Sequence, residues 1–287
     1  MSRKAAYWRD RNEPCAAIGT EKLEWGQRRE SDMKIRTTGG NRPLSAFLMD
    51  VDNTLIDIKR RDHQSFCDTA AEMGFPTLEF EEFAEMRALG ALSREIGAVL
   101  LSRGGDPERL NDFLQARHSR LDRPELFQLD TLFPGAAQVL HRISEIGIPI
   151  VAVTLRHEVK LLKMELTRLG IRDSFSGILT AGDIREQANR PYEPEYDSLC
   201  YYKGLVLEEA TKRFGLVLGE TAFVSDTEFD IEAGIKLGLI TVAVESGYGK
   251  NDRLRSMADL CLPSVAALSD MLDVFPGISD SSFFRNL

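Results

Sequence analysis

Four aspartates stand in two closely spaced pairs, each directly after an apolar segment of the chain. Asp50 and Asp52 form the first pair, and Asp226 and Asp230 form the second. Two like charges 4 Å apart repel by about 4 kcal/mol at an effective dielectric of 20. Mg²⁺ removes that cost, because it binds carboxylate and carbonyl oxygens together with waters. A carboxylate in such a site can attack phosphorus, while a second carboxyl transfers protons.

A threonine and a lysine stand at comparable places and complete this set of candidate residues. Thr154 ends an apolar run, and Lys203 is predicted to begin a helix. A hydroxyl, an ammonium group and backbone N–H groups can together hold a dianionic phosphate. The residue types therefore favour chemistry on a phosphate ester.

The elements that position these residues are short apolar runs separated by helical patterns. One such pattern, Val159 to Leu169, is followed by Gly170, a typical helix stop. The alternation predicts a parallel α/β sheet, in which ligands lie at the carboxyl ends of the strands. The apolar runs expected to be buried strands are 46–49, 148–153, 177–179, 221–224 and 239–244.

Residues 60–130 interrupt this alternation with helical patterns and no strand-like run. They predict a small all-helical insert directly after the first strand. Arg94, Arg103 and Arg117 of the insert are expected on solvated helix faces, with contact to a second anionic substrate group as the alternative. The predicted helices of the insert are 63–73, 79–89, 92–101 and 107–121.

The composition bounds the class of protein. The chain has 287 residues, is 43% hydrophobic and carries a net charge of −9. This is a globular and acidic chain, a poor candidate for a nucleic-acid binder. Its four scattered cysteines exclude a disulfide scaffold and suit a reducing cytoplasm. No apolar run is long enough to span a membrane, and the first residues lack the apolar core of a signal peptide.

Residues 1–43 are predicted to be a flexible leader. They hold ten Lys and Arg against six Asp and Glu, and both tryptophans, Trp8 and Trp25. Two alternatives stay open: a docking arm that uses the tryptophans, and translation that starts at Met33.

Four segments, in order along residues 44–275, resemble the motifs of the haloacid-dehalogenase-like superfamily. The run F-L-M-D-V-D-N-T-L, which contains Asp50 and Asp52, is similar to the first motif, D-x-D-x-T. The run V-A-V-T ending at Thr154 resembles the second, and Lys203 matches the lysine of the third. The run S-D-T-E-F-D-I-E-A-G from Ser225 is similar to the fourth, usually G-D-x-x-x-D-x-x-A-G.

Three departures from the motifs stand out. Asn53 replaces a common Gly, and Ser225 replaces the Gly before the fourth motif, where little effect is expected. Lys203 lacks the proline that often follows the motif lysine, and Arg190, followed by proline, is the alternative. Lys203 is preferred because its 23-residue spacing to Asp226 accommodates one helix and one strand, whereas Arg190 would need 36.

The resemblance implies a Rossmann-like parallel sheet of strand order 3-2-1-4-5 with helices on both faces. It implies a catalytic core over 44–59 and 131–275, a helical cap over 60–130 that closes over the substrate, and a tail over 276–287. Residues 60–130 are called the cap from here on.

The resemblance also implies a role for each site residue. Asp50 would be the nucleophile and a metal ligand, and Asp52 the general acid and base with its backbone carbonyl on the metal. Thr154 and the backbone N–H of Leu155 would bind phosphoryl oxygens, and Lys203 would neutralise the charge of the nucleophile and phosphate. Asp226 would bind Mg²⁺, and Asp230 would support the metal water or Lys203. As alternatives without catalysis, Thr154 is a structural strand-end residue and Asp230 a helix N-terminal charge.

We therefore expect a Mg²⁺-dependent, cytoplasmic phosphatase that hydrolyses a small phosphomonoester metabolite through an aspartyl-phosphate on Asp50. Asp52 decides this reaction type, because the dehalogenating members of the superfamily lack the second aspartate. No nucleic acid or membrane is expected as a partner. A phosphomutase of the same family, or a non-catalytic binding protein on this fold, are the alternatives.

Overall fold

The computed structural model of the chain describes residues 44–189 and 195–274. The predicted leader, residues 1–43, and the predicted tail, residues 276–287, lie outside these ranges, and so does Arg190. Within the described ranges, no helix combines the length and apolar character that a bilayer crossing needs.

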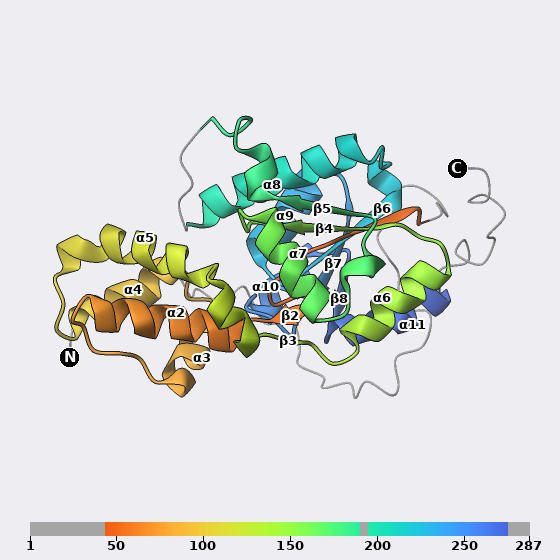
Figure 1. Ribbon diagram of the computed structural model, residues 1–287. Coiled ribbons are helices and arrows are strands. Elements are labelled where there is room, and N and C mark those ends of the chain that lie inside the picture. The colour runs from red at the N-terminus through yellow and green to blue at the C-terminus, as the bar shows by residue number, and fades with distance from the viewer. Residues whose placement is uncertain (1–43, 190–194, 275–287) are drawn as a thin grey trace, which may run out of the picture. The chain divides into compact units, whose positions relative to one another are not determined.

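Parallel strands form the central sheet, in the order β5-β4-β1-β6-β7-β8 (Figure 1). The α/β class is confirmed, and the first five strands of this sheet, numbered among themselves along the chain, have the order 3-2-1-4-5. The sixth, β8, was not predicted, because its three residues are too few to give a pattern. The strands are β1 (Ala46–Met49), β4 (Ile150–Thr154), β5 (Gly177–Thr180), β6 (Thr221–Ser225), β7 (Ile240–Val244) and β8 (Leu260–Leu262).

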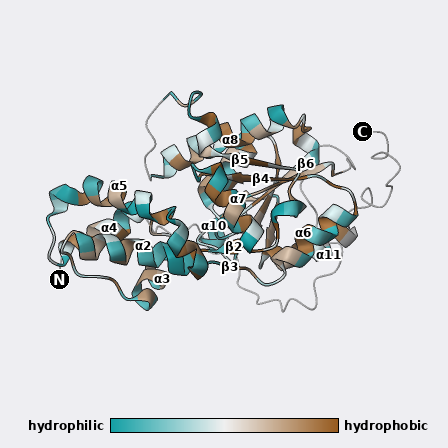
Figure 2. Cartoon of the chain, in the orientation of Figure 1, coloured by the Kyte–Doolittle hydropathy of each residue, from teal (hydrophilic) through white to brown (hydrophobic). Residues whose placement is uncertain are grey.

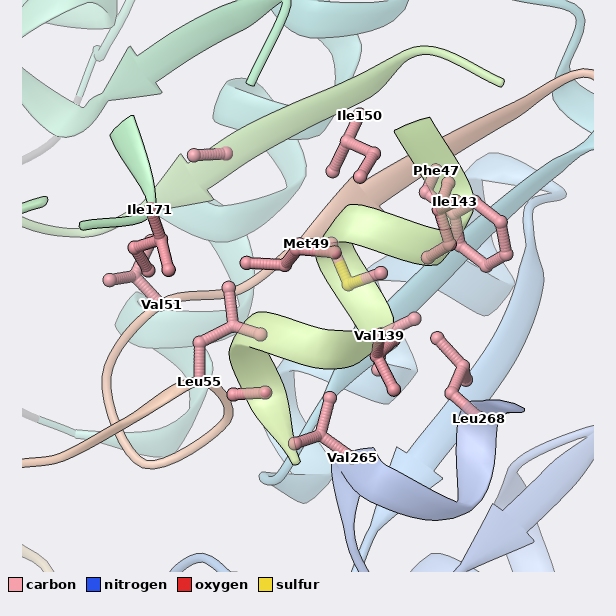
Figure 3. Packing of buried hydrophobic residues seen from close by; sticks show 14 of the residues in the cluster. Phe47, Met49, Val51, Leu55, Val139, Ile143, Ile150, Ile171, Val265 and Leu268 are labelled. Carbon is pink, nitrogen blue, oxygen red and sulfur yellow. The ribbon is translucent and has the colours of Figure 1, made fainter. Parts of the chain in front are cut away.

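Helices cover both faces of this sheet, so alternate residues of each strand enter different cores. Phe47 and Met49 lie in one cluster with residues of α6 and α11 (Figure 3), to which α7 also contributes. Leu48 packs with α8 and α9 on the other face. The strands are accordingly apolar along their length (Figure 2). The helices of the core are α6 (Ala136–Glu145), α7 (Val159–Arg168), α8 (Tyr196–Arg213), α9 (Glu228–Leu237), α10 (Asn251–Met257) and α11 (Leu268–Val274).

The predicted helical interval contains four α-helices around a hydrophobic cluster of its own. Phe66, Phe83 and Phe113 are fully buried at its centre. A short antiparallel pair, β2 (Ile56–Asp57) and β3 (Thr131–Leu132), joins the two ends of the interval. The helices are α2 (Lys59–Glu72), α3 (Phe80–Ala88), α4 (Ser93–Ser102) and α5 (Leu110–Leu121).

The cap also buries a cluster of charged side chains that the sequence did not reveal. Asp62 is 1% exposed and pairs with Arg87, at 2.7 Å, and with Arg117. Burial acts to raise the pKa of Asp62, but the two guanidinium groups outweigh it and lower that pKa. The prediction of a solvated Arg117 is therefore wrong, because helical periodicity does not show which charged residue has a buried partner.

Candidate active site

Asp50 lies at the carboxyl end of β1, in the middle of the sheet. Its backbone N–H donates to the carbonyl of Val224 in β6 at 2.9 Å, so strand pairing fixes the position from which the side chain projects. Its Oδ1 accepts a hydrogen bond from Nζ of Lys203 at 2.6 Å. Burial raises the pKa of Asp50 to about 7, although Lys203 opposes this. A buried carboxylate of this kind needs further positive charge to stay ionised at neutral pH.

The turn after β1 directs the rest of the first motif. Asn53 has φ of 59°, in the left-handed region that asparagine tolerates better than most residues. This conformation explains why an asparagine can stand where the motif commonly has a glycine. The turn places the Thr54 hydroxyl 3.1 Å from Oδ2 of Asp50 and 3.2 Å from Oδ1 of Asp226, so a single hydroxyl bridges the two motifs.

Lys203 is almost fully buried in α8 and links two of the candidate carboxylates. Its Nζ lies 2.6 Å from Asp50 and 2.9 Å from Oδ2 of Asp230. Burial alone would lower the pKa of Lys203, but the charges of Asp230 and Asp50 outweigh it and raise that pKa. The prediction that Lys203 begins a helix is wrong: α8 begins at Tyr196, two turns earlier. The prolines and tyrosines that precede Lys203 along the chain show no helical pattern from which the start at Tyr196 could be predicted.

Asp226 directly follows β6, and Asp230 lies in the first turn of α9. Asp226 is 1% exposed, and burial together with the charge of Asp50 raises its pKa well above the usual range. Asp230 accepts from the hydroxyl of Ser225 at 2.7 Å. Ser225 was expected to matter little, yet it orients the carboxylate that contacts Lys203.

Asp52 points away from this cluster toward two arginines that the motifs do not include. Nε of Arg156 donates to its Oδ2 at 2.8 Å, a second nitrogen of Arg156 contacts Oδ1, and Arg61 donates to Oδ1 at 3.1 Å. Burial acts to raise the pKa of Asp52, but Arg156, assisted by Arg61, outweighs it and holds that pKa at about 2. In this arrangement Asp52 is an ionised carboxylate.

The two arginines are themselves anchored by further acidic groups. Arg156 pairs with Glu165 of α7, and Nε of Arg61 lies 2.7 Å from Asp130. Both guanidinium groups also lie over the Phe127 ring, at 5.2 Å for Arg61 and 5.6 Å for Arg156. This network joins the start of the cap to the strand-end loop after β4.

Thr154 ends β4, the strand next to β1, and is 2% exposed. Its hydroxyl accepts from the backbone N–H of Arg156 at 3.3 Å. Leu155 follows directly in the same loop. The structure therefore brings Asp50, Lys203, Asp226 and Asp230 into one connected cluster, with Thr154 and Leu155 beside it at the same edge of the sheet.

The cluster suits a divalent cation that binds a few protein oxygens and several waters. Asp50 and Asp226 share the Thr54 hydroxyl. Burial and the charges of neighbouring carboxylates raise the pKa of both carboxyl groups. A bound cation would offset this repulsion. Oδ1 of Asp230 is buried with no hydrogen-bond partner among the described residues, an acceptor suited to a bound water. Within 44–189 and 195–274, no group of three acidic, histidine or cysteine side chains forms a metal site. Mg²⁺ commonly uses only one or two carboxylates.

Sequence reasoning missed Arg61, Arg156 and Tyr248 as neighbours of the candidate residues. Arg156 stands two residues after Thr154, and Tyr248 stands in the loop after β7, so both follow carboxyl ends of strands. Their places after strand ends could have identified both residues as candidates from the sequence. Arg61 lies in the first helix of the cap, and its contact with Asp52 depends on how the cap packs.

Comparison with known proteins agrees with this architecture. A model of the family described as haloacid dehalogenase-like hydrolase matches residues 44–238. A curated relative named phosphoglycolate phosphatase, from Chromobacterium violaceum, is 27% identical over 235 residues, which cover 80% of this chain and 96% of the relative.

Solved structures show the same fold at lower identity. A haloacid dehalogenase-like hydrolase from Streptococcus pneumoniae aligns with a TM-score of 0.59 at 18% identity, covering 79% of this chain and 98% of that one. CbbY from Rhodobacter sphaeroides, solved in complex with phosphate, aligns with a TM-score of 0.56 at 22% identity, covering 78% and 96%.

Proposed function

The chain belongs to the haloacid dehalogenase-like hydrolase family, and we propose that it is a metal-dependent phosphatase of small phosphomonoesters that forms an aspartyl-phosphate on Asp50. The observation that carries this proposal is the buried contact of Asp50 with Lys203 and, through Thr54, with Asp226. This arrangement combines a nucleophile, a fixed cation and a second carboxylate able to bind a divalent metal.

In the first half of the proposed reaction, an oxygen of Asp50 attacks phosphorus and the ester oxygen leaves. Asp52 gives the leaving oxygen its proton. In the second half, Asp52 takes a proton from water as that water attacks phosphorus, which releases phosphate and restores the Asp50 carboxylate. Thr154 and the N–H of Leu155 hold phosphoryl oxygens, and Lys203 offsets the negative charge of nucleophile and phosphate.

The metal, for which Mg²⁺ is our proposal, would be held by Asp50, Asp226 and the backbone carbonyl of Asp52, with Asp230 supporting a bound water. It would supply positive charge that offsets the charge of the phosphoryl group.

Asp52 poses a specific requirement for this mechanism. A carboxyl whose pKa is held at about 2 carries no proton to donate. Asp52 can take up a proton only after its contact with Arg156 weakens. We place that change in the step at which the substrate joins the site, since the incoming phosphate is a competing partner for a guanidinium group.

The proposal is tested by phosphate release from a panel of esters, measured with Mg²⁺ and with EDTA. Phosphoglycolate is the first substrate to test, because a curated relative is named phosphoglycolate phosphatase. A sugar phosphate and a nucleoside monophosphate complete the panel. We expect release that EDTA abolishes and added Mg²⁺ restores. Release that continues unchanged in EDTA, or none from any ester, would contradict the proposal.

A further inference from the structure

The loop after β7, residues 245–250, packs closely against Asp226. The backbone N–H of Tyr248 donates to Oδ2 of Asp226 at 2.8 Å, and that of Gly249 donates to the Asp226 carbonyl at 3.0 Å. A Cβ at position 247 would overlap the Asp226 carboxylate, and one at 249 would overlap its carbonyl. Both glycines are therefore needed for the loop to approach so closely, and the place of the Asp226 carboxylate depends on this loop.

The side chain of Tyr248 points away from Asp226 and contacts the buried charged cluster of the cap, at Asp62 and Arg87. Its hydroxyl donates to Oδ2 of Asp62 at 3.1 Å. The guanidinium of Arg87 lies over its ring, 4.9 Å from the centroid. Asp62 is 1% exposed and is held in place by Arg87 and by Arg117 of α5. Tyr248 is therefore hydrogen-bonded to a carboxylate whose position within the cap is fixed. One residue thus contacts Asp226 with its backbone and the cap with its side chain.

Two further contacts tie the same loop to the start of α2 and to the turn between α3 and α4. Nζ of Lys59, the first residue of α2, donates to the carbonyl of Ser246 at 2.9 Å. Lys250 lies against the turn between α3 and α4, where a Cβ on Gly90 would overlap its side chain. The loop is therefore held by the cap on one side and holds Asp226 on the other.

We propose that Tyr248 is a positioning residue that couples the cap to the Asp226 carboxylate. The inference rests on the proposed function in one respect, the binding of a metal by Asp226. Coupling between two sites is reciprocal. A docked cap that fixes Tyr248 strengthens metal binding, and a bound metal that fixes Asp226 strengthens cap docking.

The test is Tyr248→Phe, which removes the hydroxyl and keeps both the ring over Arg87 and the backbone N–H on Asp226. Mg²⁺ binding is measured by calorimetry on the full chain without substrate, and amide exchange is measured by mass spectrometry. We expect the Mg²⁺ dissociation constant to rise about threefold to tenfold, the range that one net hydrogen bond provides. Amides of the loop 246–250 and of α2 should exchange faster together, and Mg²⁺ should slow both in the wild type.

Tyr196→Phe is the matched control, because its hydroxyl donates to a carboxylate of the core, that of Glu232, at 2.7 Å. It should leave Mg²⁺ affinity and amide exchange of the loop unchanged. If Tyr248→Phe lowers thermal stability but behaves like the control in both measurements, the residue is merely structural and the inference is overturned.

These readouts separate the inference from the proposed function. A wild type that hydrolyses esters while Tyr248→Phe matches the control would overturn only the coupling. A wild type that binds Mg²⁺ and shows the coupling, but hydrolyses no ester, would support the inference and contradict the phosphatase proposal.

Discussion

Asp50→Asn is expected to abolish turnover, with kcat lowered by about 10⁴-fold or more. The amide has no oxygen able to form a stable bond to phosphorus, so the first half of the reaction is lost rather than slowed. The fold should persist, since asparagine has nearly the same shape and Lys203 retains its contact with Asp230 at 2.9 Å. Phosphate release and thermal unfolding, measured on the same preparation, check both expectations.

The matched control for this variant is Asp57→Asn. Asp57 lies in β2, seven residues after Asp50, and accepts a hydrogen bond from the backbone N–H of Lys59. It should retain activity near that of the wild type. Substantial turnover by a folded Asp50→Asn, with host phosphatases excluded, would move the nucleophile to another residue.

Lys203→Met is expected to destabilise the protein by about 3–5 kcal/mol and to remove most activity. Lys203 is 1% exposed and pairs with Asp50 and Asp230. Removing one partner of a buried ion pair leaves buried charge without compensation, which accounts for the size of the effect. Activity falls because the repulsion between the nucleophile and the phosphate is then no longer offset by the charge of Lys203. Urea unfolding without metal, above pH 7 where Asp50 is ionised, measures the first effect, and phosphate release the second.

The pH dependence of this variant has a definite sign. Asp50 already has its pKa raised to about 7 by burial, and loss of Lys203 raises it further. The destabilisation by Lys203→Met should therefore be largest above pH 7 and shrink as pH falls, because protonation removes the uncompensated charge. Lys212→Met, on the same helix but paired with Glu208 through side chains that solvent reaches, is the control and should stay near the wild type. A Lys203→Met variant as stable as this control would contradict the electrostatic account of the site.

Much of the site followed from the sequence because strand ends converge by geometry. Asp50, Thr154 and Asp226 come at the ends of β1, β4 and β6, which are neighbours in the sheet. A parallel sheet places such residues at one edge whatever their distance along the chain. The polar residues that follow buried strands were therefore visible without a structure.

The surroundings of Asp52 were not visible in this way. Its partners lie 9 and 104 residues away, in the cap for Arg61 and in the loop after β4 for Arg156. Long arginine side chains reach across elements, and the motif pattern does not say which carboxylate they meet. The same holds for Tyr248 and Asp62, which are 186 residues apart. Contacts between cap and core depend on packing, which periodicity does not encode.

The most direct test of the central proposal is to trap the phosphorylated enzyme. The wild type is quenched with acid during turnover of its best substrate, and the peptide that contains Asp50 is analysed by mass spectrometry, with and without hydroxylamine. We expect the mass of one phosphoryl group on Asp50, lost on treatment with hydroxylamine as an acyl phosphate should be. A phosphoryl group found on another residue would contradict the assignment of Asp50 as the nucleophile.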